Sequence, residues 1–195
     1  MSAPAPRRSG RRPGPSSTRE DVLRAARRRF AEQGYDRATF RNIAADAGVD
    51  PALVVQFFGT KQDLFVAATR PSVSLAELAE ESGAGEPADP ALGLARLLVH
   101  WLGKEEDRYA MLARIRSAAS EPAAAEMVRE MIHEQVAGFT PLIAGDRPDA
   151  RAAMVALQFL GLVWIRWVVP IDPIASMSDD ELAEWLGRGL RAFLA

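Results

Sequence analysis

The chain has 195 residues, of which 48% are hydrophobic and 26% charged, an ordinary composition for a globular protein of one or two domains. It contains no cysteine, which excludes disulfides, cysteine-ligated zinc fingers and thiol catalysis. The formal net charge of −2 is unevenly distributed, because residues 1–65 carry 12 Lys and Arg against 7 Asp and Glu, whereas the remainder carries 12 against 19. A basic first third on an acidic body predicts an end that binds a polyanion.

The first fifteen residues are rich in Pro, Gly and Ser and offer almost nothing to bury. We therefore expect residues 1–15 to form a disordered basic arm. Its arginines are Arg7, Arg8, Arg11 and Arg12. No apolar core accompanies them, so a secretion signal is not expected.

The pattern becomes helical at Ser17 or Thr18, where Thr18 and Asp21 have the spacing of a capping box, and Gly34 ends this first helix. Two short helices are then predicted over residues 39–47 and 51–57. Between them Gly48 suits a left-handed cap, while Asp50-Pro51 suits the start of a new helix. Two helices joined by so little chain must meet at a steep angle, which predicts a helix-turn-helix.

Helical patterns continue to the end of the chain, and no strand pattern occurs. A fourth helix is expected from a cap at Thr60 to about residue 81, and residues 82–90 are expected to be a linker. Five further helices are predicted over residues 90–103, 105–120, 122–139, 147–169 and 179–194. The sequence therefore predicts an all-α fold of about nine helices in two parts.

The most apolar run is Met154 to Val169. Its 16 residues include Gln158 and Arg166, so it falls short of the roughly 20 apolar residues of a membrane span. We expect no membrane partner and a cytoplasmic location.

Residues 16 to about 76 resemble the DNA-binding domain of the TetR/AcrR family of bacterial transcriptional regulators. The residues that carry the resemblance occur in order as Ala25-Ala26, Phe30, Gly34-Tyr35, Thr39, Ile43-Ala44, Ala47-Gly48-Val49, Phe58 and Lys61. Residues 141–194 are similar in overall pattern to one type of ligand-binding half in that family. The resemblance implies an all-α homodimer that binds double-stranded DNA. It places a DNA-binding domain at 16–76, with its motif at 39–58, and a ligand-binding and dimerisation domain at 77–195, without a cofactor.

Seven residues are expected to contact DNA. They are Thr39, Arg41, Pro51, Ala52, Gln56, Thr60 and Lys61. Arg41 matches a family position that reaches a base or a phosphate, and Lys61 opens a helix whose amides also favour a phosphate. Ordinary alternatives stay open for five of them: Thr39 serves equally well as a cap, Arg41 or Gln56 as a solvated surface side chain, and Pro51 and Ala52 as structural residues that need no DNA.

Two positions depart from the family pattern. Val55 and Phe57 stand where the family usually has a Tyr and often a His, and the Tyr would bond a phosphate. One phosphate contact per DNA-binding head is therefore expected to be missing, and the arm arginines are a hypothetical replacement.

The C-terminal part is expected to hold an apolar or aromatic effector between the helices that carry Trp101, Met111, His133 and Trp164, although the same residues would suit a plain core. An anionic ligand would require Arg114 or Arg166 to turn inward. The only histidines, His100 and His133, lack a carboxylate cluster, so no metal site is expected.

Dimerisation is expected through the last two helices. Met154–Val169 is apolar on nearly every face and must be covered on more than one side. The final helix would add Leu182, Trp185, Leu186 and Leu190, with Gly161, Gly187 and Gly189 allowing close approach of the backbones.

These expectations favour a transcriptional repressor released from an inverted-repeat operator by a small apolar or aromatic ligand. Two alternatives remain open. One is a constitutive dimeric DNA-binding protein without ligand control, and the more distant one is a helical enzyme, for which no nucleophile–base arrangement is recognised in the sequence.

Overall fold

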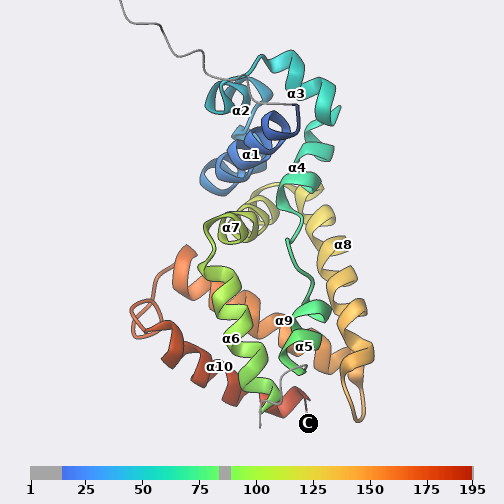
Figure 1. Ribbon diagram of the computed structural model, residues 1–195, viewed down its shortest axis with the longest axis vertical. Helices are drawn as coiled ribbons and strands as arrows, with labels where there is room; N and C mark the ends of the chain where they lie inside the picture. Colours follow the sequence, from blue (N-terminus) through green and yellow to red (C-terminus); the bar gives the residue numbers. More distant parts are fainter. Residues whose placement is uncertain (1–14, 84–88, 195) are drawn as a thin grey trace, which may run out of the picture.

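The computed structural model describes residues 15–83 and 89–194, which form ten α-helices, one 3-10 turn and one π-helical turn and contain no strand (Figure 1). The all-α prediction is confirmed. Residues 1–14 of the predicted arm, including its four arginines, lie outside the described residues. So do residues 84–88 of the predicted linker.

One predicted helix is in fact two. The elements in chain order are α1 (Pro15–Arg37), α2 (Phe40–Ala47), α3 (Pro51–Phe58), α4 (Lys61–Thr69), α5 (Leu75–Gly83), α6 (Pro90–Gly103), α7 (Glu105–Ser120), α8 (Pro122–Phe139), η1 (Thr140–Leu142), α9 (Pro148–Val163), η2 (Trp164–Val168) and α10 (Asp179–Leu194). The prediction of one helix from Thr60 to residue 81 was wrong, because Arg70 leaves the helical region with ψ 132°. The cause is Pro71, which lacks an N–H and disfavours helical backbone in the preceding residue.

The head, which we define as α1–α4, packs around aromatic side chains. Phe30 of α1 and Phe65 of α4 are fully buried with ring centroids 5.1 Å apart in an edge-on arrangement, and Tyr35 lies 5.3 Å from Phe65. The expected break at Gly34 is present, since this residue has φ 77° and interrupts α1. The expected cap at Thr18 is wrong, because α1 already begins at Pro15.

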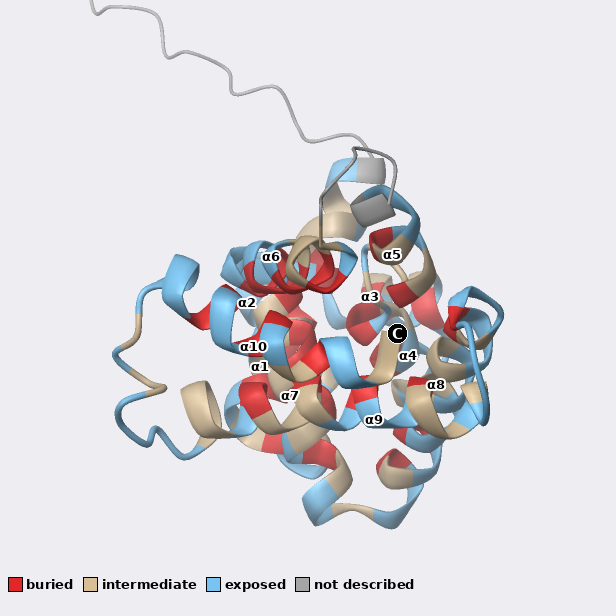
Figure 2. Ribbon diagram, turned by 90° about the horizontal axis from the view of Figure 1, so that it is seen from below, coloured by how far each residue is buried: buried red, intermediate tan, exposed pale blue. Residues whose placement is uncertain are grey.

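The body, which we define as α5–α10, has its own apolar core. Leu94, Leu98 and Leu102 of α6 pack there with Leu190 of α10, and all four are almost completely buried. Figure 2 shows buried residues concentrated on the sides of α6, α7 and α10 that meet other helices.

Helix α7 connects the two parts. It crosses beneath α1 in Figure 1, and the core of the head continues into α7 and α8 through Ala113, Met127 and Val128. Arg116 of α7 donates from Nη1 to the Glu32 carbonyl oxygen at 3.0 Å. The head is therefore seated on the body through a continuous packed interface.

The apolar helix near the C-terminus, α9 with η2, has nearly the predicted bounds. Pro148–Val168 spans 21 residues and, by length and composition alone, would be long and apolar enough to cross a membrane. A third of its most apolar window is buried inside the protein. Since core helices of soluble proteins pass the same test, this finding is weak evidence for a membrane span.

Candidate nucleic-acid interface and ligand cavity

Helices α2 and α3 form the predicted helix-turn-helix. The Thr39 side chain caps α2 by accepting from the Asn42 N–H at 3.2 Å, and Gly48 ends the helix in the left-handed region with φ 68°. Asp50 caps α3 by accepting from the Ala52 N–H at 2.8 Å, with Pro51 at the first position. These local caps fix the turn without help from the rest of the chain.

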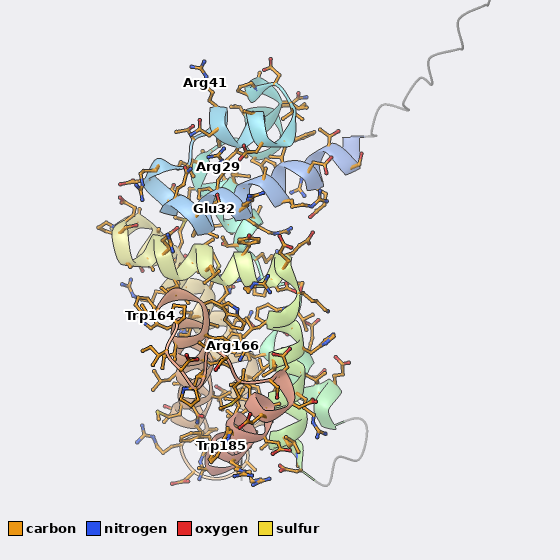
Figure 3. All side chains as sticks on the ribbon, turned by 90° about the vertical axis from the view of Figure 1, so that its left-hand side faces the viewer. Arg29, Glu32, Arg41, Trp164, Arg166 and Trp185 are labelled. Atoms are coloured by element: carbon orange, nitrogen blue, oxygen red, sulfur yellow. The ribbon has the colours of Figure 1, made fainter. Side chains whose placement is uncertain are left out.

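The predicted DNA contacts of these two helices are all solvent-exposed. Thr39 and Arg41 lie at the start of α2, Pro51 and Ala52 at the start of α3, and Gln56 farther along α3. Figure 3 shows Arg41 projecting from the end of the molecule farthest from the body. We call these five residues the recognition surface, and their contact with DNA stays a prediction.

The inner sides of the same helices hold them in place. Val54 and Phe58 of α3 are buried in the head core. Arg29 of α1 pairs with Asp46 of α2 through two hydrogen bonds, one of them 2.6 Å from Nη2 to Oδ1, and this lowers the pKa of the Asp46 carboxyl. The helix-turn-helix is thus clamped to α1 on the side opposite the recognition surface.

Val55 and Phe57, the two positions that depart from the family pattern, have different surroundings. Val55 is 46% exposed, so an apolar side chain stands on the open face of α3. Phe57 is half-buried against the head core, with its ring 6.2 Å from that of Phe58. Neither side chain can form a hydrogen bond to a phosphate. Packing explains the apolar residue at position 57 but not the one at position 55.

Thr60 and Lys61 begin α4, and both have internal partners. The Thr60 hydroxyl accepts from the Asp63 N–H at 3.1 Å, forming a capping box. The Lys61 ammonium donates to the Asp36 carbonyl oxygen at 3.0 Å and lies 4.5 Å above the Tyr35 ring. Partial burial lowers the pKa of Lys61. Lys61 therefore ties α4 to the end of α1, and its predicted phosphate contact must use its remaining donors.

A small cavity lies in the body near its junction with the head. Its volume is about 50 Å³, room for one or two water molecules. Its lining comprises Pro71, Val73, Leu75, Leu78, Leu98, Trp101, Met111, Arg114, Val128, Met131, Ile132, Gln135, Ala156, Phe159 and Leu160. The walls are almost entirely apolar, as a site for an apolar ligand requires.

Two of the four predicted ligand residues are wrongly placed. Trp101 and Met111 line the cavity, and the Trp101 indole donates to the Ser72 hydroxyl at 2.9 Å. His133 is exposed, because α8 lines the cavity with its neighbour Ile132 and the next residue points about 100° away. Trp164 is 43% exposed and lies outside the lining.

Of the two arginines considered for an inward role, one lines the cavity. Arg114 is 5% exposed and donates from Nε to the Thr69 carbonyl oxygen at 2.7 Å. Arg166 instead donates to the carbonyls of Ile174 and Met177 and to the Asp179 carboxylate, so it holds the loop before α10 (Figure 3). Most of the lining contributed by α8 and by residues 71–78 was not predicted from the sequence. The Pro71 break was the available signal for the latter group.

Four large apolar side chains are exposed on α9, at the start of η2 and on α10. Met154, Leu157 and Trp164 occur at helical spacing and are 39%, 58% and 43% exposed, and Trp185 of α10 is 57% exposed. Figure 3 shows Trp164 and Trp185 on the same side of the body. We call these four residues the α9–α10 face.

The other residues expected in a dimer contact have internal roles. Leu182, Leu186 and Leu190 are buried within the body. A Cβ at Gly187 would lie 3.0 Å from the Leu92 Cα, so this glycine brings α10 close to α6 of the same chain, while Gly189 faces Gln158. These faces of α10 are therefore not available for a contact between subunits, and dimerisation through the last two helices stays a prediction.

Acidic and histidine side chains do not gather into a metal-binding group: within residues 15–83 and 89–194, no three of them are close enough to hold an ion.

Both parts of the chain match models of known protein families. Residues 22–68 match the model for bacterial regulatory proteins of the tetR family, and residues 92–194 match the tetracyclin repressor-like C-terminal domain. A curated relative, the HTH-type transcriptional repressor AcnR of Corynebacterium glutamicum, is 37% identical over 70 residues. That match covers 35% of this chain and 37% of the relative, so the chain spans little more than a third of the length of this relative.

Solved structures match over nearly the whole chain. A TetR-family regulator from Streptomyces coelicolor A3 is 31% identical, with a TM-score of 0.66, and the match covers 95% of this chain and 99% of that one. SmeT in complex with triclosan has the same fold, with a TM-score of 0.67, 23% identity and 90% coverage of each chain. The matched proteins are regulators, which sets the helical-enzyme alternative aside. The chain therefore belongs to the TetR family of bacterial transcriptional regulators.

Proposed function

We propose that this protein is a DNA-binding transcriptional repressor that acts as a homodimer and is released from its operator by a small ligand. The observation that carries the proposal is the helix-turn-helix, whose recognition surface is exposed while its inner side is fixed to α1. A recognition helix of this kind enters the major groove with its N-terminal residues at the base edges, and Pro51 and Ala52 occupy that position. The relative AcnR carries the name of a repressor.

The α9–α10 face supports the dimer. Four large apolar side chains are exposed on these helices, and a two-fold contact between subunits would bury both copies of them. A symmetric pair of heads should read an inverted repeat with half-sites roughly 34–36 Å apart or a multiple of that distance.

The cavity supports control by a ligand. SmeT, which shares the fold, has been solved with triclosan. The cavity of about 50 Å³ is far below the roughly 300–1,000 Å³ of typical ligand pockets, so an effector would have to part the surrounding helices. Because α4 joins the head to the body here, such an opening would move the heads.

The same small volume favours a second candidate, a constitutive DNA-binding protein whose body only dimerises. One experiment addresses both functions. Selection of bound sites from random DNA, followed by a gel shift on the upstream region of the gene, should yield an inverted repeat. A small molecule that abolishes this binding would favour the repressor, whereas failure to select any sequence would contradict both.

Arg41 is expected to contribute to sequence recognition. Arg41→Ala should weaken operator binding by about 1–3 kcal/mol and relax the preference at one base position, because a bidentate contact to guanine is lost. Fluorescence anisotropy with single-base operator variants measures both effects. Arg129→Ala removes another exposed arginine, on α8 in the body, and is the control. If Arg41→Ala left the affinity for every operator variant unchanged, the assignment of Arg41 as a base contact would be contradicted.

Lys61 is expected to act without regard to sequence. Lys61→Ala should weaken binding to all DNA sequences alike and flatten the dependence of log K on log salt by about one unit, since one phosphate contact is removed. It should also destabilise the head, because the contacts with Tyr35 and Asp36 are lost. Lys104→Ala, at the only other lysine, is the control. An unchanged salt slope with a destabilised head would leave Lys61 a purely structural residue.

A further inference from the structure

Two arginines from different parts of the molecule hold the C-terminal end of α4. Arg27 of α1 donates from Nε to the Ala68 carbonyl oxygen at 2.9 Å, and Arg114 of α7 donates to the Thr69 carbonyl oxygen at 2.7 Å. The last carbonyls of a helix lack partners within the helix, and its negative end attracts cations. The end of α4 is therefore clasped between the head and the body.

The two arginines differ in their electrostatic surroundings. Arg27 forms ion pairs with Glu20 and Glu106 at the edge of the head. Arg114 is almost completely buried and forms no ion pair within the part of the chain that the structure describes. Burial lowers its pKa to about 10, and the negative charge of Asp107 on the same helix opposes this shift. Arg114 thus stays charged at neutral pH with only a neutral carbonyl as its described hydrogen-bond acceptor.

Arg114 is also the only charged residue in the cavity lining. The other strongly polar member, Gln135, already accepts from the Leu75 N–H at 3.0 Å through its side-chain oxygen. A buried guanidinium that has no carboxylate hydrogen-bonded to it, only the more distant charge of Asp107, is a costly arrangement, and an incoming anion would relieve it. Its planar set of donors matches the two oxygens of a carboxylate.

We infer that the effector is a small apolar carboxylic acid whose carboxylate binds Arg114 and takes the place of the Thr69 carbonyl oxygen. This inference rests on the proposed function and specifies the ligand class and the route by which it controls the head. The apolar part of the acid lies among Trp101, Met111 and Phe159. Losing the Arg114 bond removes the hydrogen bond that ties the last turn of α4 to α7 and leaves Arg27 as its remaining arginine contact.

The consequence for DNA binding follows from this exchange. Without the hydrogen bond between Arg114 and the Thr69 carbonyl, the head can adopt positions that do not match the operator. The acid stabilises those positions, because it binds only when that hydrogen bond is broken. A change of about 5–150-fold in operator affinity is the usual range for coupling of this kind.

The test compares acids with matched alcohols on the full-length dimer. Hexanoate, octanoate, decanoate and phenylacetate are each titrated beside the primary alcohol of the same carbon skeleton, by calorimetry and by Trp fluorescence. At least one acid should bind about tenfold or more tightly than its alcohol, because charge-assisted hydrogen bonds are the stronger ones. That acid should also lower operator affinity more than the alcohol does. Equal binding of acid and alcohol throughout the panel would overturn the inference, as would binding of neither.

Variants locate the effect. Arg114→Gln should abolish the preference for the acid while leaving alcohol binding within about twofold, and Arg114→Lys should retain part of it. Arg27→Gln loosens the same helix end but does not touch the cavity, so it should keep the full preference. If Arg114→Gln does not fold, the acid–alcohol difference of the unchanged protein still decides the matter. Failure to bind any DNA would refute the proposed function alone, whereas operator binding without acid selectivity would refute the inference alone.

Discussion

Leu157→Glu is expected to convert the protein from a dimer into a monomer and to remove tight operator binding. Leu157 is the most exposed large apolar residue of the α9–α10 face, and a two-fold contact would bury the new carboxylate twice. Burial of an unpaired charge costs several kcal/mol per ion. Separated heads would also lose the advantage of simultaneous engagement, which amounts to about 10²–10⁴ in affinity. Light scattering at micromolar concentration and operator titration measure the two losses.

The control is the same substitution at a leucine away from the proposed contact. Leu142 of η1 is 44% exposed, so Leu142→Glu adds an equal charge to a comparably open position. It should leave both the mass and the DNA affinity unchanged. A Leu157→Glu protein that remained dimeric would show that the α9–α10 face is not the contact.

Phe30→Ala is expected to lower the free energy of unfolding of the head by about 3–5 kcal/mol, since it removes a fully buried ring and leaves a cavity between Phe65 and Tyr35. Hydrogen exchange resolves the head from the body, and the amides of α1–α4 should lose protection while those of α6 and α10 keep theirs. Val66→Ala, at a 41% exposed position of α4, should change stability by no more than about 0.5 kcal/mol. Uniform loss of protection over both parts would instead mean that head and body unfold together.

The helix-turn-helix could be predicted closely because its determinants are local. Gly48, Asp50 and Pro51 each act within a few residues of their own position, so the turn between α2 and α3 follows from the sequence alone. Pro71 is an equally local determinant, because proline ends a helix at or before the preceding residue. The prediction of one continuous helix across Pro71 was wrong because it did not take this property into account.

The faces of the body helices could not be predicted in the same way. Helical periodicity shows that a stripe is apolar but does not say which neighbouring helix covers it. Gly187 therefore suggested a contact between subunits, although it packs on Leu92 of its own chain. Likewise, His133 and Ile132 are adjacent in sequence, yet only Ile132 lines the cavity, because the rotation of α8 is set by packing with distant segments.

The small volume of the cavity has a consequence for the rate of ligand binding as well as for its affinity. With a volume of about 50 Å³, the cavity cannot admit an organic acid until the surrounding helices separate. Association would then be slower than the 10⁵–10⁷ M⁻¹s⁻¹ that is typical, since each productive encounter must coincide with an opening. At high ligand concentration the observed rate would level off at the opening rate of the protein. Once the ligand is saturating, the opening rate of these helices would then limit how quickly the regulated genes respond.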